Sequence, residues 1–463
     1  MASRNHDMDM CNGPLFKKIL IFSLPIMAMN LLQLLFNAAD MIVVGRFSGS
    51  RALAAVGATG ALINLIINLF MGLSVGTSVI VAQDYGANKP DDVSRSVHTS
   101  IAISIIGGLI VMVAGSVLCK PLLILMGTPS DIIDLSELYM KIYFMGLPAS
   151  MVYNFGSAIL RAVGDSRHPM YYLVLAGILN VFLNLFFVIV LHMSVDGVAW
   201  ATIISQYLSV VLIMICLYRC DGAIRFIPSK MRIDSRKLKA IVKIGLPAGL
   251  QGLLFSISNV LIQSAVNLFG STMVAASSAA GNVEGFVGTA MNAYYNAAIS
   301  FTGQNMGAKK YDRIDTIAKV CTVLIFATWI LLGGLTMLLG RPLIGLYTSD
   351  PEVINLGIQR LNVMMIAYFT CGMMNVYPGL IRGMGFSLLP MLCTLIGACL
   401  MRIVWLATVF AWSPTIIVLF ACYPVTWALT GLGHVGIFLY TRKKVRRQGA
   451  PEAQASYAAQ NIS

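Results

Sequence analysis

Charged side chains are scarce in this sequence of 463 residues. Asp, Glu, Lys and Arg make up 11% of it, whereas hydrophobic residues make up 58%. A soluble domain typically carries about 25% charged residues, so the composition excludes a soluble globular protein. Polar stretches are also short, and none is long enough to bury a core of its own outside a membrane. The composition therefore predicts a membrane protein.

Motifs for enzymatic chemistry and for ATP-driven transport are also missing. The sequence contains no G-x-x-x-x-G-K-[ST] or H-E-x-x-H pattern and no segment like a selectivity filter. ATP is therefore not the expected energy source. The nine cysteines include no C-x-x-C pair, and the five histidines are scattered, so we expect neither a disulfide framework nor a metal cluster. We expect no enzyme activity and no cofactor.

Apolar stretches fill most of the chain. A helix needs about 20 apolar residues to cross a bilayer. Twelve stretches qualify: 18–44, 53–82, 93–119, 135–160, 168–191, 195–219, 240–269, 274–303, 315–340, 354–381, 388–411 and 414–440. We therefore expect an all-α membrane protein with twelve transmembrane helices.

The net charge of +13 is distributed unevenly between the loops. Lys and Arg gather before the first stretch and after the second, fourth, sixth, eighth, tenth and twelfth. The other loops hold only Arg46, Arg51, Lys120 and Arg341. By the positive-inside rule, both termini are then cytoplasmic. The charge thus indicates a multi-pass protein of the cytoplasmic (inner or plasma) membrane, in contact with membrane lipid, and no nucleic-acid partner.

Composition also suggests how the chain divides. We expect a disordered N-terminus over residues 1–14, a six-helix N-terminal lobe over 15–219, a cytoplasmic linker over 220–239, a six-helix C-terminal lobe over 240–440 and a basic cytoplasmic tail over 441–463. The linker is basic and polar, which is compatible with a short helix on the membrane surface.

The two halves of the sequence repeat each other. For example, Gln83-x-x-Gly86-Ala87 matches Gln304-x-x-Gly307-Ala308 at an offset of 221 residues, and five other blocks keep that offset. Each half contains six apolar stretches, so both copies enter the membrane from the same side. Parallel repeats of this kind are related by an axis along the membrane normal. We expect two six-helix lobes around a central cleft, which alternates between the two sides when one lobe rocks on the other.

Asp40 lies near the end of the first apolar stretch, with no Lys or Arg within five residues on either side. An ionisable side chain inside a membrane span is costly, and it usually faces a cavity, a partner charge or a bound cation. The alternative is that Asp40 lies at headgroup level and only caps the end of a helix.

The repeat shows where the halves diverge. The first half has Asp40, Asn180, Asn184, Thr202 and Gln206 where the second half has Leu261, Met401, Trp405, Tyr423 and Trp427. Asn180 and Asn184 share one helix face because they are four residues apart. A carboxylate with amide and hydroxyl oxygens suits Na⁺, and a proton site is equally compatible. Hydrogen bonding between helices by Asn and Gln is the structural alternative.

The second half has its own ionisable residues within spans, Glu284 and Arg402. We expect both to face the lobe interior or the cleft, and they could pair with each other. One interpretation is a structural ion pair. The other is that Glu284 helps to bind a cationic substrate or a coupling proton. Arg402 is the only Arg that we expect inside a span. Pro25 is predicted to bend the first span beside the cleft. Further residues predicted to line the cleft are Gln33, Asn37, Asn154, Gln206, Gln251, Gln263, Asn282 and Asn292.

Together these features resemble the MATE (multidrug and toxic compound extrusion) family of prokaryotic type. The resemblance rests on the twelve spans in two halves, on Asp40-x-x-x-x-Gly45, on the two Gln-x-x-Gly-Ala blocks, and on Arg161-x-x-Gly164 with Arg382-x-x-Gly385. It covers residues from about 15 to 440. It implies an antiporter that exports small organic cations in exchange for H⁺ or Na⁺ through a V-shaped cleft.

The resemblance also implies a cation or proton coupling site, with possible Na⁺, at Asp40, Asn180, Asn184 and Thr202. Many relatives have Asp where this chain has Asn184, which weakens the case for tight Na⁺ binding. Another branch of the family has coupling carboxylates at places that match Phe255 and Cys371 here, so that mechanism is not expected, and Glu284 occupies neither place.

Two other functions stay open at this stage. The first is a flippase for lipid-linked oligosaccharides or other lipids in the same superfamily, which would favour a groove rich in Arg or Lys. The second is a membrane enzyme or receptor that transports nothing. The sequence leaves the substrate, the coupling ion and the oligomeric state undetermined.

Overall fold

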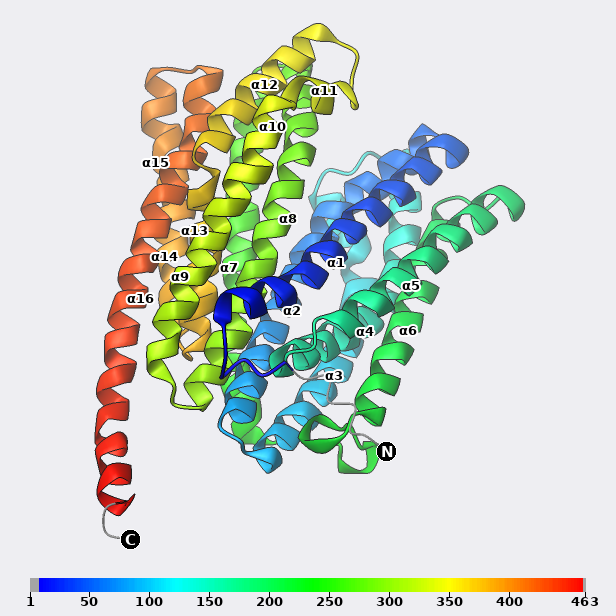
Figure 1. Ribbon diagram of the computed structural model, residues 1–463. Helices are drawn as coiled ribbons and strands as arrows, with labels where there is room; N and C mark the ends of the chain where they lie inside the picture. The colour runs from blue at the N-terminus through cyan, green and yellow to red at the C-terminus, as the bar shows by residue number, and fades with distance from the viewer. Residues whose placement is uncertain (1–7, 461–463) are drawn as a thin grey trace. The chain divides into compact units, whose positions relative to one another are not determined.

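A computed structural model describes residues 8–460 of the chain. Helices account for most of these residues, and no β-strand occurs between residues 8 and 460 (Figure 1).

Six long helices make up the first half of the chain. They are α1 (Leu15–Val43), α2 (Ser50–Gly86), α3 (Pro90–Leu125), α4 (Ile133–Val163), α5 (Arg167–Leu185) and α6 (Val195–Arg219). Short π-helical turns extend α1 over Val44–Ser48 and α5 over Phe186–Val190. Local sequence accounts for several boundaries. Pro90 starts α3, where its missing N–H costs nothing, and Gly164 ends α4 in the left-handed conformation with φ of 106°.

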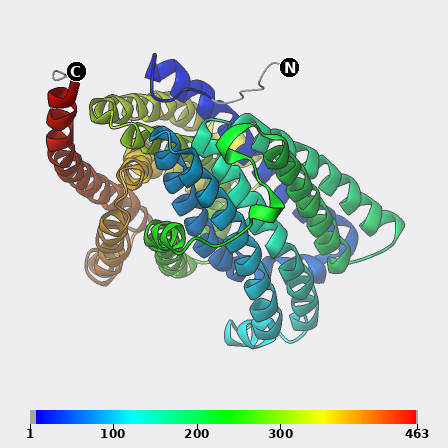
Figure 2. The same ribbon diagram turned by 90° about the horizontal axis from the view of Figure 1, so that it is seen from below.

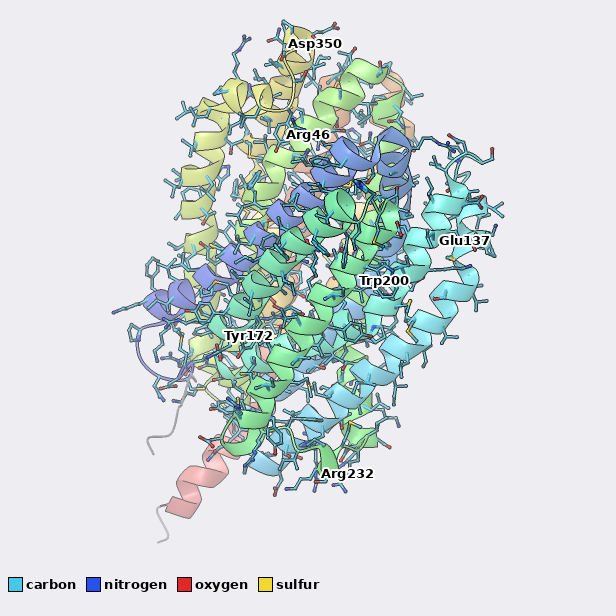
Figure 3. The ribbon with its side chains drawn as sticks, turned by 90° about the vertical axis from the view of Figure 1, so that its right-hand side faces the viewer. Arg46, Glu137, Tyr172, Trp200, Arg232 and Asp350 are labelled. Atoms are coloured by element: carbon cyan, nitrogen blue, oxygen red, sulfur yellow. The ribbon has the colours of Figure 1, made fainter. Side chains whose placement is uncertain are left out.

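The linker between the halves contains two short 3₁₀ turns, Gly222–Ile224 and Pro228–Lys230. It runs across one end of the helices of the first half before α7 begins (Figure 2). Arg232 of the linker therefore lies at the opposite end of these helices from Arg46 and Glu137 (Figure 3).

The second half is also helical but more interrupted. Its helices are α7 (Ser235–Asn267), α8 (Ser271–Gly307), α9 (Tyr311–Thr328), α10 (Gly334–Leu338), α11 (Gly340–Gly345), α12 (Pro351–Ile366), α13 (Tyr368–Gly383), α14 (Leu388–Thr394), α15 (Met401–Trp405) and α16 (Ile416–Gln460). The π-helical turn Trp329–Gly333 joins α9 to α10, Leu395–Leu400 joins α14 to α15, and Leu406–Phe410 follows α15.

The helix lengths fit a protein that spans a membrane repeatedly. Within residues 8–460, nine helices are long and apolar enough to cross a bilayer, and the bent pair α12 and α13, at 52° to each other, would make a tenth. Helices α4 and α8 have suitable lengths but a more polar composition, because α4 begins with charged residues and α8 is rich in Ala, Gly, Ser and Asn. They complete the twelve expected helices, so the predicted all-α membrane fold is confirmed.

Backbone contacts divide the chain into two compact units. Unit 1 contains Met8, Ala28–Tyr85 and Lys89–Leu246, and unit 2 contains Asp9–Met27, Gly86–Asn88 and residues 247–460. Helices α1 and α7 are therefore each shared between the units, and each is divided close to its internal proline, Pro25 or Pro247.

Each unit has its own apolar core. In unit 1, α1, α2, α4 and α6 bury one cluster that includes Val44, Ala55, Ile142 and Val198. In unit 2, a cluster built mainly from α7, α8 and α16 includes fully buried Ile262. Burial of Val43 and Val44 fixes the end of α1 against its neighbours, which positions Asp40 one turn earlier.

The two ends of the chain differ from the sequence expectation. Residues 9–13 were expected to be disordered, but in unit 2 their backbone carbonyls accept hydrogen bonds from Lys18, Asn305, Lys310 and Arg313, and Met10 is fully buried. Residues 1–7 of the predicted disordered segment lie outside the described residues.

The expected tail from residue 441 onwards continues α16 as far as Gln460. Arg442 pairs with Asp315 at 2.9 Å, and Arg446 pairs with Asp312 and Asp315 at 2.7 Å. Acidic residues of α9 thus hold the start of this basic segment, and residues 461–463 lie outside the described part.

Candidate functional site

A hollow of about 480 Å³ lies in unit 1, bordered by α1, α2, α4, α5 and α6. Six residues singled out in the sequence line it: Gln33, Asn37, Asp40, Asn180, Thr202 and Gln206. The structure thus brings together side chains from three helices that are distant in sequence. Gly177 of α5 makes room for this wall, because a Cβ there would lie 1.9 Å from a ring atom of Phe36.

Asp40 is the end of a chain of polar contacts in this hollow. Its carboxylate accepts a hydrogen bond from the Asn184 amide. The same Asn184 Nδ2 lies 3.3 Å from Asn180 Oδ1, and Asn180 Nδ2 lies 3.5 Å from Thr202 Oγ1. Thr202 in turn donates to the carbonyl of Val198 at 2.9 Å. The four residues that the family resemblance indicated are therefore in contact with one another.

Two features of this cluster suit a cation or a proton. Asp40 forms no ion pair with any side chain among residues 8–460, so no protein cation balances its charge. Asn184 is 1% exposed, and its buried Oδ1 has no hydrogen-bond partner in the described part of the chain. A buried acceptor without a partner costs free energy. A cation bound here, or a proton on the carboxyl group of Asp40, would give the Asn184 oxygen a partner.

The donor set favours neither ion outright. No group of three or more His, Cys, Asp and Glu side chains able to hold a metal occurs in the described part of the chain. Na⁺, however, prefers carboxylate, amide and hydroxyl oxygens, which Asp40, Asn184 and Thr202 offer. With one carboxylate, the cluster can bind Na⁺ or a proton.

Aromatic residues of α4 also line this hollow, and the sequence analysis missed them. Tyr139 and Tyr143 stack with ring centroids 6.0 Å apart. Two signals could have found them. They are four residues apart on one helix face, and Tyr139 is opposite Arg360 in the repeat, a divergence of the same kind as that at Asp40.

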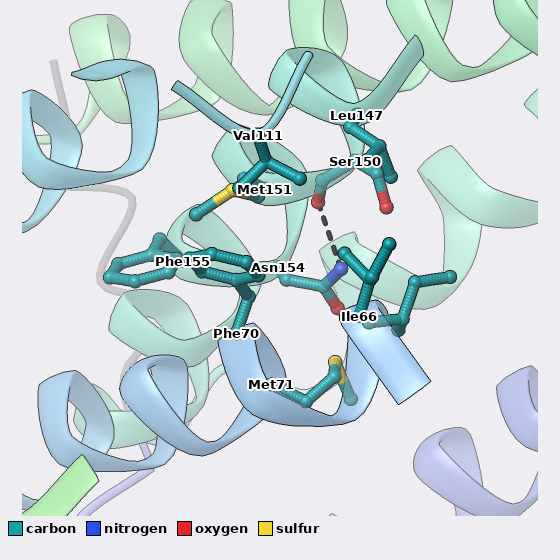
Figure 4. A pocket seen from close by; sticks show the side chains of 10 residues that line it. Ile66, Phe70, Met71, Val111, Leu147, Ser150, Met151, Asn154 and Phe155 are labelled. Atoms are coloured by element: carbon teal, nitrogen blue, oxygen red, sulfur yellow. Dashed lines mark hydrogen bonds between the residues drawn. The ribbon is translucent and has the colours of Figure 1, made fainter. Parts of the chain in front are cut away.

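Asn154 lies outside this hollow. It borders a separate apolar crevice of about 10 Å³ between α2, α3 and α4 (Figure 4). Its amide donates to the carbonyl of Ser150 at 2.8 Å within the same helix. Asn154 is thus satisfied locally, and the structure does not bring it to Asp40.

Glu284 has a different partner from the expected one. The Arg360 guanidinium binds its carboxylate with two hydrogen bonds, at 3.0 Å from Nε and 3.1 Å from Nη2, and Arg360 also binds Ser277. The suggested Glu284–Arg402 pair is therefore wrong, and so is the expectation that Arg402 is the only Arg inside a span. Arg360 lies inside the predicted span 354–381, and the sequence analysis overlooked it.

Arg402 is fully buried and forms no ion pair with any residue between 8 and 460. Its Nη1 donates to Asn259 Oδ1 at 2.7 Å, and the guanidinium lies 4.9 Å from the Phe255 ring and 4.5 Å from the Tyr423 ring. Its Nη2 has no hydrogen-bond partner. Cation–π contacts with two rings replace an ion pair at this position.

The other candidates in unit 2 do not form one cluster. Gln251 accepts a hydrogen bond from Arg382 at 2.6 Å, and Gln263 donates one to Asn267 at 3.1 Å. Asn292 accepts a hydrogen bond from Asn296, and Asn282 is exposed. Pro25 lies in the part of α1 that belongs to unit 2. At the positions equivalent to the polar cluster, unit 2 has the rings of Trp405, Tyr423 and Trp427, of which Trp427 is 4% exposed. Bulky rings thus occupy the place that the polar cluster occupies in unit 1.

Comparison with known proteins agrees with this architecture. The family described as MatE matches residues 25–186 and again 247–408. The probable multidrug resistance protein YpnP of Bacillus subtilis is 29% identical over 406 residues, which cover 87% of this chain and 90% of that protein. A protein named FAD transporter from Shewanella oneidensis is 24% identical over 79% of this chain and 82% of its own length.

A solved structure has the same fold. It belongs to a MOP superfamily transporter from Pyrococcus furiosus, with a TM-score of 0.87 at 23% identity, and the match covers 96% of this chain and 99% of that one.

Proposed function

Because this chain belongs to the MATE family, whose members are multidrug efflux transporters and not enzymes, we propose that it is a secondary active antiporter. It exports organic cations across the cytoplasmic membrane in exchange for H⁺ or Na⁺. Membership of this family of transporters also excludes the alternative that the protein is a membrane enzyme. The observation that carries the proposal is the unbalanced carboxylate of Asp40 beside a hollow of about 480 Å³.

The hollow of unit 1 has features that suit an organic cation. Asp40 supplies a negative charge, and Tyr139, Tyr143 and Phe36 supply aromatic faces. A cation above such a face gains roughly 0.5–2 kcal/mol. The volume of about 480 Å³ is also within the range of small-molecule sites.

Transport of the ion and of the substrate is coupled because both compete for the negative charge of Asp40. In this proposal Asp40, Asn180, Asn184 and Thr202 form the coupling site, and H⁺ or Na⁺ arriving from outside neutralises Asp40. Neutralisation removes the attraction for a cationic substrate, which is then released. An ion can shift an equilibrium between two conformations only by the difference in its affinity for them. The gradient therefore drives export if the ion binds the outward-open state more tightly.

The test is uptake of a fluorescent organic cation into inverted vesicles, with a proton gradient and a sodium gradient imposed separately. We expect uptake to follow one of the two gradients, which identifies the ion. Asp40→Asn should abolish gradient-driven uptake because the variant keeps the shape of the side chain and loses its charge.

Asp134→Asn is the matched control, because that carboxylate is on α4 of the same unit and its side chain is 87% exposed. It should transport normally. Gradient-driven uptake by a folded Asp40→Asn protein would refute the assignment of the coupling site.

A second candidate concerns the substrate. The Shewanella relative is named FAD transporter, and FAD is an anion, so this name favours an anionic substrate over an organic cation. The same vesicles decide between the two, because FAD uptake without uptake of organic cations would favour the anionic substrate.

A further inference from the structure

The linker between α6 and α7 forms an arch over the beginning of α3 in unit 1. The arch comprises residues 227–234, and its residues 229–232 line an open hollow of about 450 Å³, with α3 as the other wall. At one end of the arch, the Ile227 N–H donates to His98 Nε2 at 3.1 Å. At the other end, the Asp234 N–H donates to Thr99 Oγ1 at 3.0 Å. Both His98 and Thr99 are buried, so the arch is attached to the core of the unit.

The chemistry of His98 explains the first attachment. Its Nδ1 lies 2.7 Å from the carbonyl of Ser94, which can only accept a hydrogen bond, so Nδ1 carries the proton. Nε2 lies 3.1 Å from the Ile227 nitrogen and 3.2 Å from the Ile227 carbonyl oxygen. The ring also stacks on Phe226 with centroids 5.4 Å apart. The imidazole therefore holds the arch by its polar contacts with the Ile227 backbone and by one ring contact.

A third attachment continues into α7. Lys237 Nζ lies 2.7 Å from Asp84 and 3.5 Å from Asp92, which ties the first turn of α7 to the ends of α2 and α3. The pKa of Asp234 is held below its usual range, first by the backbone N–H of Lys237, so that carboxylate stays ionised. Fixed at three places, the hollow is a preformed feature of the unit.

Positive charge dominates the lining of this hollow. Arg95 projects from α3, and Lys230 and Arg232 come from the arch, whereas Asp91 is the one acidic lining residue. The side chains of Lys230 and Arg232 form no hydrogen bond or ion pair with any residue between 8 and 460. Elsewhere in unit 1, Lys237 is fully occupied by carboxylates. Lys230 and Arg232 are therefore available for an external anion.

Apolar side chains flank the same place. Met231 is 48% exposed between Lys230 and Arg232, and Ile233 is 43% exposed beside them. The arch lies at the ends of the α3 and α6 spans, where Arg232 is at the extremity of unit 1 (Figure 3). Basic residues next to exposed apolar ones at the end of a span are typical of contact with anionic lipid headgroups.

We propose that the hollow under the 227–234 arch binds the phosphate of an anionic phospholipid headgroup. Arg95, Lys230 and Arg232 are its cationic contacts, and the exposed side chains of Met231 and Ile233 are its apolar contacts with the lipid. Lipid bound here reinforces the junction between the arch and α7. The site is separate from the Asp40 cluster and does not depend on the transport reaction.

The experiment uses the purified full-length protein in detergent, with its melting temperature measured as phosphatidylglycerol or phosphatidylcholine is added. We expect phosphatidylglycerol alone to stabilise the parent protein at low lipid concentration. Lys230→Gln with Arg232→Gln should weaken that binding about 30-fold, the factor that corresponds to two lost contacts of roughly 1 kcal/mol each. Both side chains are exposed, so the double variant should fold normally without lipid.

A second double variant, Arg219→Gln with Lys239→Gln, is the matched control. It removes two exposed cations near the same linker that do not line the hollow. It should keep the response to phosphatidylglycerol. An equal loss in both double variants would show a diffuse charge effect and overturn the proposal, as would an unchanged response in the Lys230 and Arg232 variant.

Soluble phosphate distinguishes the two sources of the anion. Inorganic phosphate and glycerol 3-phosphate are added to the same proteins in place of lipid. We expect little stabilisation, because neither ligand carries an acyl chain that could pack against Met231 and Ile233. If they stabilise the parent as well as phosphatidylglycerol does, and only when Lys230 and Arg232 are present, the site binds a soluble phosphate and the lipid assignment is wrong.

Discussion

Asp40 and Glu284 are both carboxylates within long helices, and their surroundings differ in one respect. Asp40 meets only neutral partners, Asn184 first among them, whereas Glu284 meets the guanidinium of Arg360 with two hydrogen bonds. A carboxylate with neutral partners can exchange a proton or a cation during a transport cycle. A paired one is held in a single state, so we propose a structural role for Glu284.

Removal of the Glu284 charge should therefore affect stability first. Glu284→Gln leaves Arg360 with a buried, unpaired charge, and breaking such a pair typically costs about 3–5 kcal/mol. Replacing both partners, as in Glu284→Gln with Arg360→Met, should cost less than the single change because no charge is left unpaired. Melting temperatures in detergent would measure the difference as a double-mutant cycle.

The control for this cycle is Glu352→Gln, an exposed residue at the start of α12, which should melt with the parent. If Glu284→Gln and the double variant melt at the same temperature, the pair contributes nothing to the stability of unit 2.

The sequence alone identified some residues of the candidate site, and others were found only in the structure. Asn180, Asn184 and Thr202 were found because the two halves of the chain differ there, and the structure places them together. Arg360 and Tyr139 occupy equivalent positions of the same repeat, yet neither was identified, because each looked ordinary in its own stretch. Which side chain meets which depends on how helices pack, and that information is not local.

Helices α2 and α7 pack backbone against backbone within unit 1. A Cβ on Gly76 would lie 2.3 Å from the carbonyl oxygen of Ile241 and 2.9 Å from the nitrogen of Gly245, and one on Gly245 would lie 2.7 Å from Cα of Leu73. Gly72 and Gly76 form a small-x-x-x-small pattern, which permits close packing of membrane helices. The contact is backbone against backbone, so no rotamer change can relieve an added methyl group.

Gly76→Ala should accordingly destabilise the protein, although alanine favours a helix by about 1 kcal/mol over glycine. The measurement is the melting temperature in detergent. Gly57→Ala on the same helix is the matched control, since a Cβ at Gly57 meets nothing within 4 Å. It should be neutral or slightly stabilising, so the two substitutions have opposite signs. If both raise the melting temperature, α2 and α7 are not packed as closely as described.

The distribution of Lys and Arg predicts the orientation of the whole molecule. The basic loops follow even-numbered spans, and an even number of spans returns the chain to its starting side. We expect both termini to be cytoplasmic and the loop between α3 and α4 to be external.

Two exposed serines test this orientation in intact cells. Ser130→Cys, between α3 and α4, should react with a membrane-impermeant maleimide above the labelling of the parent protein. Ser229→Cys, in the linker, should react only after the cells are opened. The reverse pattern would invert the topology and place the arch outside the cell.

The sequence by itself determined the membrane class, the twelve helices, the internal repeat and the polar cluster around Asp40. Hydropathy decides which segments leave water, and a duplication keeps a constant offset, so these features can be recognised without knowing any contact. Tertiary structure alone decided that Glu284 binds Arg360, that Tyr139 and Tyr143 line the hollow, and that the linker is fixed over α3. Partners are chosen by packing between helices that are distant along the chain, where burial makes an unpaired charge or polar atom costly.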